Sequence, residues 1–331
     1  MFFLTFLTII LLLSFNFSVV IYKKIANKYK FISYPKPRDS HIIEVVKGAG
    51  IIFFLFIFIY SFIIQFWTEH KSILYQSILL LTPIITLISF IDDKININWK
   101  IKILFDLITV IMITLFFYEA ILSNHNFLIQ IIIIFSLLWF INLINFIDGS
   151  DGYLTTVLIL SLLSNLLTKY FFHDEFIFFQ LLIILLLFNF LFYNFPPASI
   201  FLGDSGSRFF AVLLIIFFIN DILKYNHMLV FIWFGSLQLI ITDTCYTLIF
   251  RLLTKNNWMS EHKEHAYQLL TNYYGHKISI YWLILNTGFI FLPSLILFYY
   301  FKIHLLIIIV LSLILYLSQI IYIKHLLHNK I

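Results

Sequence analysis

The sequence predicts an all-α, polytopic integral membrane protein with about eleven transmembrane helices. Of the 331 residues, 62% are hydrophobic and only 11% are charged, and the mean hydropathy is +1.01, far from the balance of a soluble domain. Apolar runs of about 17 to 25 residues recur along the chain, and each is long enough to cross a bilayer as a helix. The runs are continuous and do not alternate with period two, which indicates helices and not a barrel.

The predicted helices follow one another without a soluble domain or an internal repeat. The first apolar run has no basic residue before it and no small-residue cleavage site, so we expect an anchor and not a signal peptide. We therefore expect residues 1–331 to form a single integral membrane domain. The expected helices cover residues 2–22, 49–66, 73–91, 101–118, 127–146, 153–169, 176–193, 208–220, 228–250, 279–300 and 303–323.

The basic residues separate sharply between the two sets of alternate loops. One set carries 17 of the 21 lysines and arginines, whereas the other carries only Lys71, Lys169, Lys224 and Lys302. Loops rich in lysine and arginine stay on the cytoplasmic side of a membrane. We therefore expect the N-terminus outside and the C-terminus in the cytoplasm.

Four polar clusters lie in the loops of the basic side. Several oxygen ligands with few nitrogen or sulfur donors suit a hard cation such as Mg²⁺, which bridges protein carboxylates to substrate phosphates. One cluster leads into a predicted helix, whose N-terminus favours an anion. Together they predict phosphoryl or phosphosugar transfer at the membrane surface. The clusters are Asp92-Asp93-Lys94, the run from Asn142 to Gly152, Gly203 to Ser207, and Glu261 to His265.

Each cluster taken alone also has a purely structural interpretation. The double aspartate would be a helix stop, the glycines after Asp148 would make a turn, and a serine after Gly203 would cap a helix. His262 and His265 would be solvated loop residues, since their spacing lacks further zinc ligands. Asp243 is either a buried hydrogen-bonding group or part of the site wall, and the sequence leaves both interpretations open.

In this order, the clusters resemble the polyprenyl-phosphate N-acetylhexosamine-1-phosphate transferases, glycosyltransferase family 4, from about Pro35 to Leu270. The run Asn142-Leu-Ile-Asn145-Phe-Ile-Asp148-Gly-Ser-Asp151-Gly152 resembles the family's Asn-x-x-Asn-x-x-Asp-Gly-x-Asp-Gly segment at each of those positions. Phe201-Leu-Gly-Asp-Ser-Gly-Ser207 resembles its glycine-aspartate metal loop. The double-aspartate motif corresponds to Asp92-Asp93, with Lys102 as the basic residue nine positions later and Asp106 where glutamine is frequent.

The N-terminal and C-terminal motifs of the matching region each differ from the family's pattern at one position. Pro35-Lys-Pro-Arg38-Asp-Ser-His41 and Lys47-Gly48-Ala49-Gly50 resemble its N-terminal element, with Ala49 in place of a third glycine. Glu261-His-Lys-Glu-His-Ala-Tyr-Gln268 resembles the His-Arg-x-His-x-Tyr-Gln element of the branch near WecA and WbpL, with Lys263 where arginine is usual. The triple histidine of the related MraY branch is absent, which argues against the peptidoglycan pentapeptide precursor as substrate.

The resemblance implies an enzyme that transfers N-acetylhexosamine-1-phosphate from a UDP-sugar to undecaprenyl phosphate and releases UMP. The product would be the lipid-linked first sugar of a cell-surface glycan such as the O-antigen of lipopolysaccharide. It also implies a multi-pass protein of the bacterial inner (cytoplasmic) membrane with its site on the cytoplasmic face. Mg²⁺ is the expected cofactor, with Mn²⁺ as a substitute, and no nucleic acid is expected as a partner.

The same resemblance implies a role for each matching residue. Asp92 and Asp93 would orient or deprotonate the lipid phosphate; orientation fits better, because a phosphate monoester is already largely ionised at neutral pH. The expected metal ligands are Asp204 and Asn145; the expected catalytic residues are Asp92, Asp93, Asp148, Asp151 and Lys102; the expected substrate-binding residues are Asn142, Arg251, His262, His265 and Lys47.

A secondary transporter or flippase of lipid-linked sugars is the alternative from another functional class. Such proteins place ionisable residues near the bilayer midplane on broken helices with repeat symmetry, whereas here the acids gather at one face and no repeat is visible. If the protein were a non-catalytic scaffold, the clustered carboxylates would have no common function. Within the enzyme class, a different lipid phosphotransferase is a further alternative. The sequence also leaves open the sugar, the glycan pathway and a homodimer, since no decisive small-residue motif faces the lipid.

Overall fold

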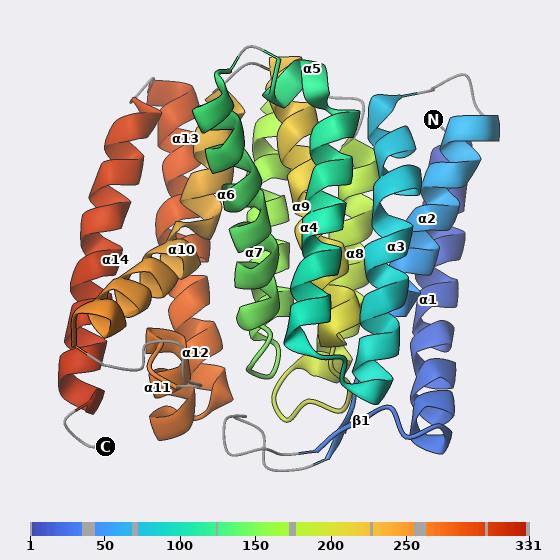
Figure 1. Ribbon diagram of the computed structural model, residues 1–331, viewed down its shortest axis with the longest axis horizontal. Helices are drawn as coiled ribbons and strands as arrows, with labels where there is room; N and C mark the ends of the chain where they lie inside the picture. The colour runs from blue at the N-terminus through green and yellow to red at the C-terminus, as the bar shows by residue number, and fades with distance from the viewer. Residues whose placement is uncertain are drawn as a thin grey trace.

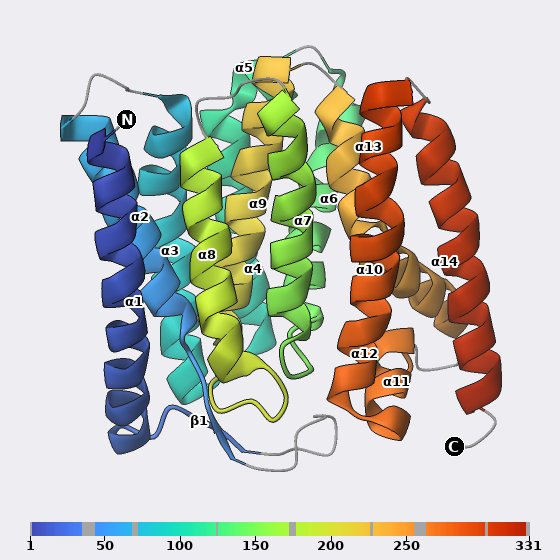
Figure 2. The same ribbon diagram turned by 180° about the vertical axis from the view of Figure 1, so that it is seen from behind.

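The computed structural model describes residues 2–34, 44–67, 72–123, 125–171, 177–225, 228–254, 263–301 and 304–328, and it shows one bundle of helices packed side by side (Figures 1 and 2). α1 (Phe2–Lys28) begins at the upper end of the bundle in Figure 1. The long helices then alternate in direction until α14 (Leu305–His328) finishes at the lower end.

Between these two helices lie the remaining elements of the bundle. A short antiparallel pair, β1 (Ile32–Ser33) and β2 (Val45–Val46), follows α1. The helices are α2 (Gly50–Trp67), α3 (Ile73–Ile95), α4 (Trp99–Phe116), α5 (Tyr118–Ile121), α6 (Phe127–Phe146), α7 (Tyr153–Phe171), α8 (Ile177–Asn194), α9 (Gly203–Tyr225), α10 (Met228–Thr254), α11 (Ala266–Tyr274), α12 (His276–Leu283), the π-helical η1 (Ile284–Phe291) and α13 (Leu292–Phe301).

Ten helical segments of the described chain are long and apolar enough to cross a membrane, and the continuous segment from α12 to α13 counts as one of them. α4 carries Lys100, Lys102 and Asp106, yet it runs parallel to its neighbours (Figure 1) and corresponds to the remaining predicted span. Large apolar side chains such as Phe192 and Leu13 are exposed on the outside of the bundle, as expected where lipid is the solvent. The predicted fold class, an all-α polytopic membrane protein, is confirmed.

α9 is the central helix of the bundle. It is buried along most of its length and packs against α2, α3, α6 and α10. Its first turn touches the first turn of α2 backbone to backbone: a Cβ atom at Gly50 would lie 2.0 Å from the backbone nitrogen of Gly206. A side chain at Gly50 would therefore force α2 and α9 apart.

Three local predictions about the helices were wrong. α9 begins at Gly203, five residues before the predicted start, because a carboxylate from another helix accepts its first N–H groups. α11 was not predicted, since a nine-residue helix beside the bundle carries no long apolar run. Lys169, which was assigned to an outer loop, lies within α7 and is fully buried.

Lys169 belongs to a buried polar cluster towards the far ends of α7 and α9. Its Nζ lies 2.8 Å from Oδ1 of Asp221 on α9. The other carboxylate oxygen of Asp221 accepts hydrogen bonds from Asn165 Nδ2 (2.9 Å) and Trp233 Nε1 (2.8 Å). The ion pair thus ties α7, α9 and α10 together inside the bundle.

Candidate functional site

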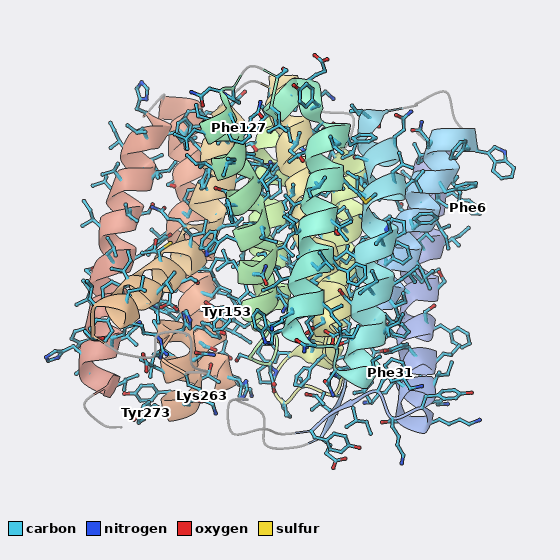
Figure 3. All side chains as sticks on the ribbon, in the orientation of Figure 1. Phe6, Phe31, Phe127, Tyr153, Lys263 and Tyr273 are labelled. Carbon is cyan, nitrogen blue, oxygen red and sulfur yellow. The ribbon has the colours of Figure 1, made fainter. Side chains whose placement is uncertain are left out.

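The polar segments converge at the lower end of the bundle. In Figure 3, Phe31, Tyr153 and Lys263 mark this end, whereas Phe127 lies at the upper end. The end of α3, the start of α4, the turn between α6 and α7, the start of α9 and the segment before α11 all meet here (Figure 1). The described residues of the four clusters, which are far apart in the sequence, therefore lie at one end of the bundle.

Asp93 holds the first turn of α9. Its Oδ1 accepts the backbone N–H of Asp204 at 2.9 Å, and its Oδ2 accepts that of Ser205 at 3.1 Å. The first N–H groups of a helix have no partner within the helix, so an external carboxylate can accept their hydrogen bonds. Its negative charge also interacts favourably with the positive end of the helix dipole. Gly203 makes this approach possible, because a Cβ atom there would lie 2.6 Å from Oδ1 of Asp93. Asp93 therefore positions α9 through contacts with backbone.

Asp92 faces the opposite way and shares two cations with Asp204. Lys102 Nζ lies 2.5 Å from Oδ2 of Asp92 and 3.2 Å from Oδ2 of Asp204. Arg208 Nη1 lies 2.8 Å from the same oxygen of Asp204 and 3.9 Å from that of Asp92. The side chains of Asp204 (32% exposed) and Lys102 (27%) are the members of this four-residue cluster that an incoming molecule can reach, whereas Asp92 is only 3% exposed.

Arg208 is a site residue that the sequence interpretation missed. Its Nε donates to Oδ1 of Asp106 at 3.0 Å, so the departure from glutamine at position 106 supplies a buried counter-charge. Arg208 stands one turn after Asp204 on α9. Extending the predicted helix back to Gly203 would have placed the two side chains on one face.

The segment after α6 contributes to the same face. Ser207 Oγ donates to Oδ1 of Asn145 at 2.6 Å, which joins α6 to the first turns of α9. Burial and the negative charges of Asp204 and Asp93 raise the pKa of Asp148 well above its usual range, and a backbone hydrogen bond from Gly203 partly opposes this rise. Asp148 is therefore a carboxylate close to the other acids.

Three other predicted site residues make hydrogen bonds that hold the backbone around the site. Asn142 donates to the carbonyl of Leu138 one turn earlier in α6. Asp151 accepts the N–H of Ala198 at 3.0 Å and so fastens the loop before α9. Lys47 follows β2, where its carbonyl accepts the Tyr22 hydroxyl at 2.8 Å, and its charge acts on Asp93.

Asp243 shapes the C-terminal part of the site. Its carboxylate accepts the N–H groups of Ala266 (2.9 Å) and Tyr267 (3.5 Å), so it caps α11. This places His265 at the start of α11, with its ring centroid 4.7 Å from that of Phe146. Of the two interpretations left open by the sequence, the structure supports the hydrogen-bonding group.

The groups around α11 are buried and paired. Burial, helped by the positive charge of Lys324, lowers the pKa of His265 to about 3, so the ring is neutral at physiological pH. Arg251 is 2% exposed and lies 3.1 Å from Glu264, which fixes the segment before α11. His262 and the element from Pro35 to His41 lie outside the described residues.

The donor set of the cluster suits a hard divalent cation. Asp204 and Asn145 supply oxygen from adjoining helices, and no cysteine lies among them. Within the described ranges, no group of three or more histidine, cysteine, aspartate or glutamate side chains forms a metal cage. Mg²⁺ binds through one or two carboxylates, several waters and substrate phosphates, so the residues fit this ion without such a cage.

Comparisons with known proteins agree with the motifs. Residues 75–221 match the family model of glycosyl transferase family 4, a range from α3 to α9. The chain is similar to a probable undecaprenyl-phosphate N-acetylglucosaminyl 1-phosphate transferase of Bacillus subtilis, with 27% identity over 83% of this chain and 79% of the relative. It is also similar to an undecaprenyl-phosphate alpha-N-acetylglucosaminyl 1-phosphate transferase of Thermotoga maritima, with 24% identity over 76% of each chain. With the motif clusters gathered at one end of a membrane bundle, the chain is similar to glycosyl transferase family 4 over the range from α3 to α9.

Proposed function

We propose that the protein transfers N-acetylhexosamine-1-phosphate from a UDP-sugar to undecaprenyl phosphate and releases UMP. The names of both relatives support this reaction class and make UDP-N-acetylglucosamine the first donor to test. We further propose that the product is the first lipid-linked sugar of a surface glycan such as O-antigen. The gathering of lysine and arginine at the lower end supports a site on the cytoplasmic face of the inner membrane.

One observation carries the proposal: two carboxylates share two cations at the ends of membrane helices. Lys102 and Arg208 are each held within 4 Å of Asp92 and Asp204, so both cations point at one place. A diphosphate that arrives there can bind both cations through its own oxygens. A site at the ends of membrane helices would also let a lipid enter sideways from the bilayer and a nucleotide enter from water.

The residues of the site would act by orientation and charge neutralisation. An oxygen of undecaprenyl phosphate attacks the β-phosphorus; the new O–P bond forms while the bond from that phosphorus to the bridging oxygen breaks, and UMP leaves with the bridging oxygen. Lys102 and Arg208 hold the phosphates in line, and Asp92 keeps Lys102 in place. Such a transfer depends on positioning more than on covalent help.

Asp204 and Asn145 are the residues that would hold the divalent cation. Mg²⁺, when bound, would neutralise charge on the diphosphate. Asp204 is suited to this role because its carboxylate is the most exposed member of the four-residue cluster. Asp93 would keep Asp204 in position, since its carboxylate accepts the backbone N–H groups of Asp204 and Ser205.

The test is UMP release by purified protein with undecaprenyl phosphate, Mg²⁺ and a panel of UDP-N-acetylhexosamines, with and without chelator. Asp204→Asn should lose about a hundredfold or more in rate, the scale on which one electrostatic contact counts in catalysis. Lys224→Gln, at the far end of the same helix, is the matched control and should keep the wild-type rate. Folded wild-type protein that releases no UMP with any donor would contradict the proposal and favour a transporter.

A further inference from the structure

His276 makes a hydrogen-bonded contact with the turn between α6 and α7. It is the first residue of α12, and its Nδ1 lies 3.0 Å from the backbone nitrogen of Asp151 and 3.0 Å from Oγ of Ser150. These two residues belong to the Asn142 to Gly152 segment, whereas His276 lies beyond the range of the family resemblance, which ends near Leu270.

The direction of one of these hydrogen bonds is fixed. A backbone N–H only donates, so Nδ1 of His276 must accept from Asp151. In this contact, Nδ1 therefore presents its lone pair and not a hydrogen. Ser150 Oγ lies 3.0 Å from the same Nδ1, so a hydrogen bond from its hydroxyl would share the single lone pair of that nitrogen with the Asp151 N–H.

The corner between α11 and α12 carries further hydrogen bonds around His276 and Ser150. Thr271 Oγ1 on α11 lies 3.3 Å from Ser150 Oγ and donates to Ser279 Oγ at 3.0 Å. Ser279 in turn donates to the carbonyl of His276 at 2.8 Å. Gly275, at φ +88°, makes the sharp corner that starts α12 at His276. Residues of α11 and α12 therefore contact the Ser150 side chain and the backbone of His276.

The turn held by this ring also carries Asp148. The charge of Asp148 interacts with Asp204 and Asp93, so a shift of the turn moves a carboxylate of the candidate site. The carboxylate of Asp151 is already engaged, because its Oδ2 accepts the N–H of Ala198. Nδ1 of His276 is then the group that fixes the Ser150–Asp151 backbone against the C-terminal helices.

We propose that His276 is a positioning residue: its Nδ1 accepts the Asp151 N–H and holds the turn that places Asp148 beside Asp204. The positioning of substrate rests on the proposed function above, whereas the hydrogen bond does not. The role is specific to one atom of the ring.

Two substitutions separate that atom from the rest of the side chain. The Oδ1 atom of asparagine reaches the place of Nδ1, whereas the terminal group of glutamine reaches that of Nε2. We expect His276→Gln to lower kcat by about tenfold or more, since small misplacements of reacting groups have effects of this size. KM for the UDP-sugar and for undecaprenyl phosphate should stay within about threefold, and His276→Asn should restore most of kcat. His304→Gln, which follows the break between α13 and α14, is the matched control.

The outcomes are distinguishable from failure of the proposed function. Equal kcat for wild type, His276→Gln and His276→Asn would overturn the inference, and so would equal loss in both variants with unchanged thermal stability. If wild-type protein releases no UMP, amide hydrogen exchange over residues 147–153 decides: protection retained in His276→Asn and lost in His276→Gln supports the contact, and equal protection overturns it. The same exchange measurement applies if one variant is too unstable for kinetics.

Discussion

Oδ1 of Asp93, at the end of α3, accepts the backbone N–H of Asp204, at the start of α9, at 2.9 Å. This bond divides the double aspartate into two roles. Asp93 uses both oxygens on the backbone of α9, whereas Asp92 directs a carboxylate oxygen to Lys102. The two neighbouring acids therefore respond differently to substitution.

Asp93→Ala should mainly destabilise the protein, whereas Asp92→Ala should mainly inactivate it. The first leaves two N–H groups of α9 without their acceptor, and each buried unsatisfied donor costs about 1–3 kcal/mol. The second leaves the start of α9 intact but loosens Lys102, and we expect a rate about a hundredfold lower. Thermal unfolding in detergent and UMP release per folded molecule measure the two effects. Wild-type stability of Asp93→Ala would contradict the capping role.

Gly50→Ala should prevent stable folding. The added methyl group would lie 2.0 Å from the backbone nitrogen of Gly206. Because this contact is with backbone, no side-chain rotation can relieve it. Overpacking in a well-packed core costs about 1–3 kcal/mol, and backbone against backbone is the severe case. Gly288→Ala is the matched control, because its nearest contact would be an ordinary 3.5 Å. Yield and unfolding temperature in detergent should fall for the first variant only.

Lys169→Met and Asp221→Asn should each destabilise the protein by about 3–5 kcal/mol, since each leaves a buried charge without its partner. The double variant should recover much of this loss, because it removes both charges while the amide of asparagine can still accept from Trp233. A double-mutant cycle of chemical unfolding in micelles measures the coupling. Simple addition of the two single effects would show that the ion pair contributes nothing.

Stability should fall between pH 6.5 and 3 through His265. Its pKa is about 3 in the folded protein and 6.5 when exposed, so in this window the unfolded state binds one more proton. The slope from this residue is at most about 1.4 kcal/mol per pH unit. His265→Asn should therefore unfold with a weaker pH dependence between pH 6.5 and about 5. Parallel stability curves for the two proteins would show that His265 is not held neutral.

The sequence predicted the helices because the bilayer imposes a minimum apolar length on each span. Most boundaries agree within a few residues, and the convergence of Asp92 and Asp204 follows from their place at one set of helix ends. The start of α9 was placed too late because its cap, Asp93, stands 111 residues earlier. Local patterns do not contain that information.

The residues that support the site could not be predicted either, because their contacts join residues that are far apart in the sequence. Arg208 lies in an apolar helix, and its contact with Asp106 on α4 depends on how α4 and α9 pack. The contact of His276 with Asp151 joins residues 125 positions apart. The motifs indicated which side chains gather, whereas the hydrogen bonds between motifs depend on how the helices pack.

The bond between Asp93 and Asp204 limits how this protein can be recombined with its relatives. A chimera whose crossover falls between α3 and α9 would join a cap from one parent to a helix start from the other. The end of α3 and the start of α9 have to be exchanged together, although 111 residues of chain separate them. The smallest unit that can be transplanted with its geometry intact is therefore most of the segment from α3 to α9.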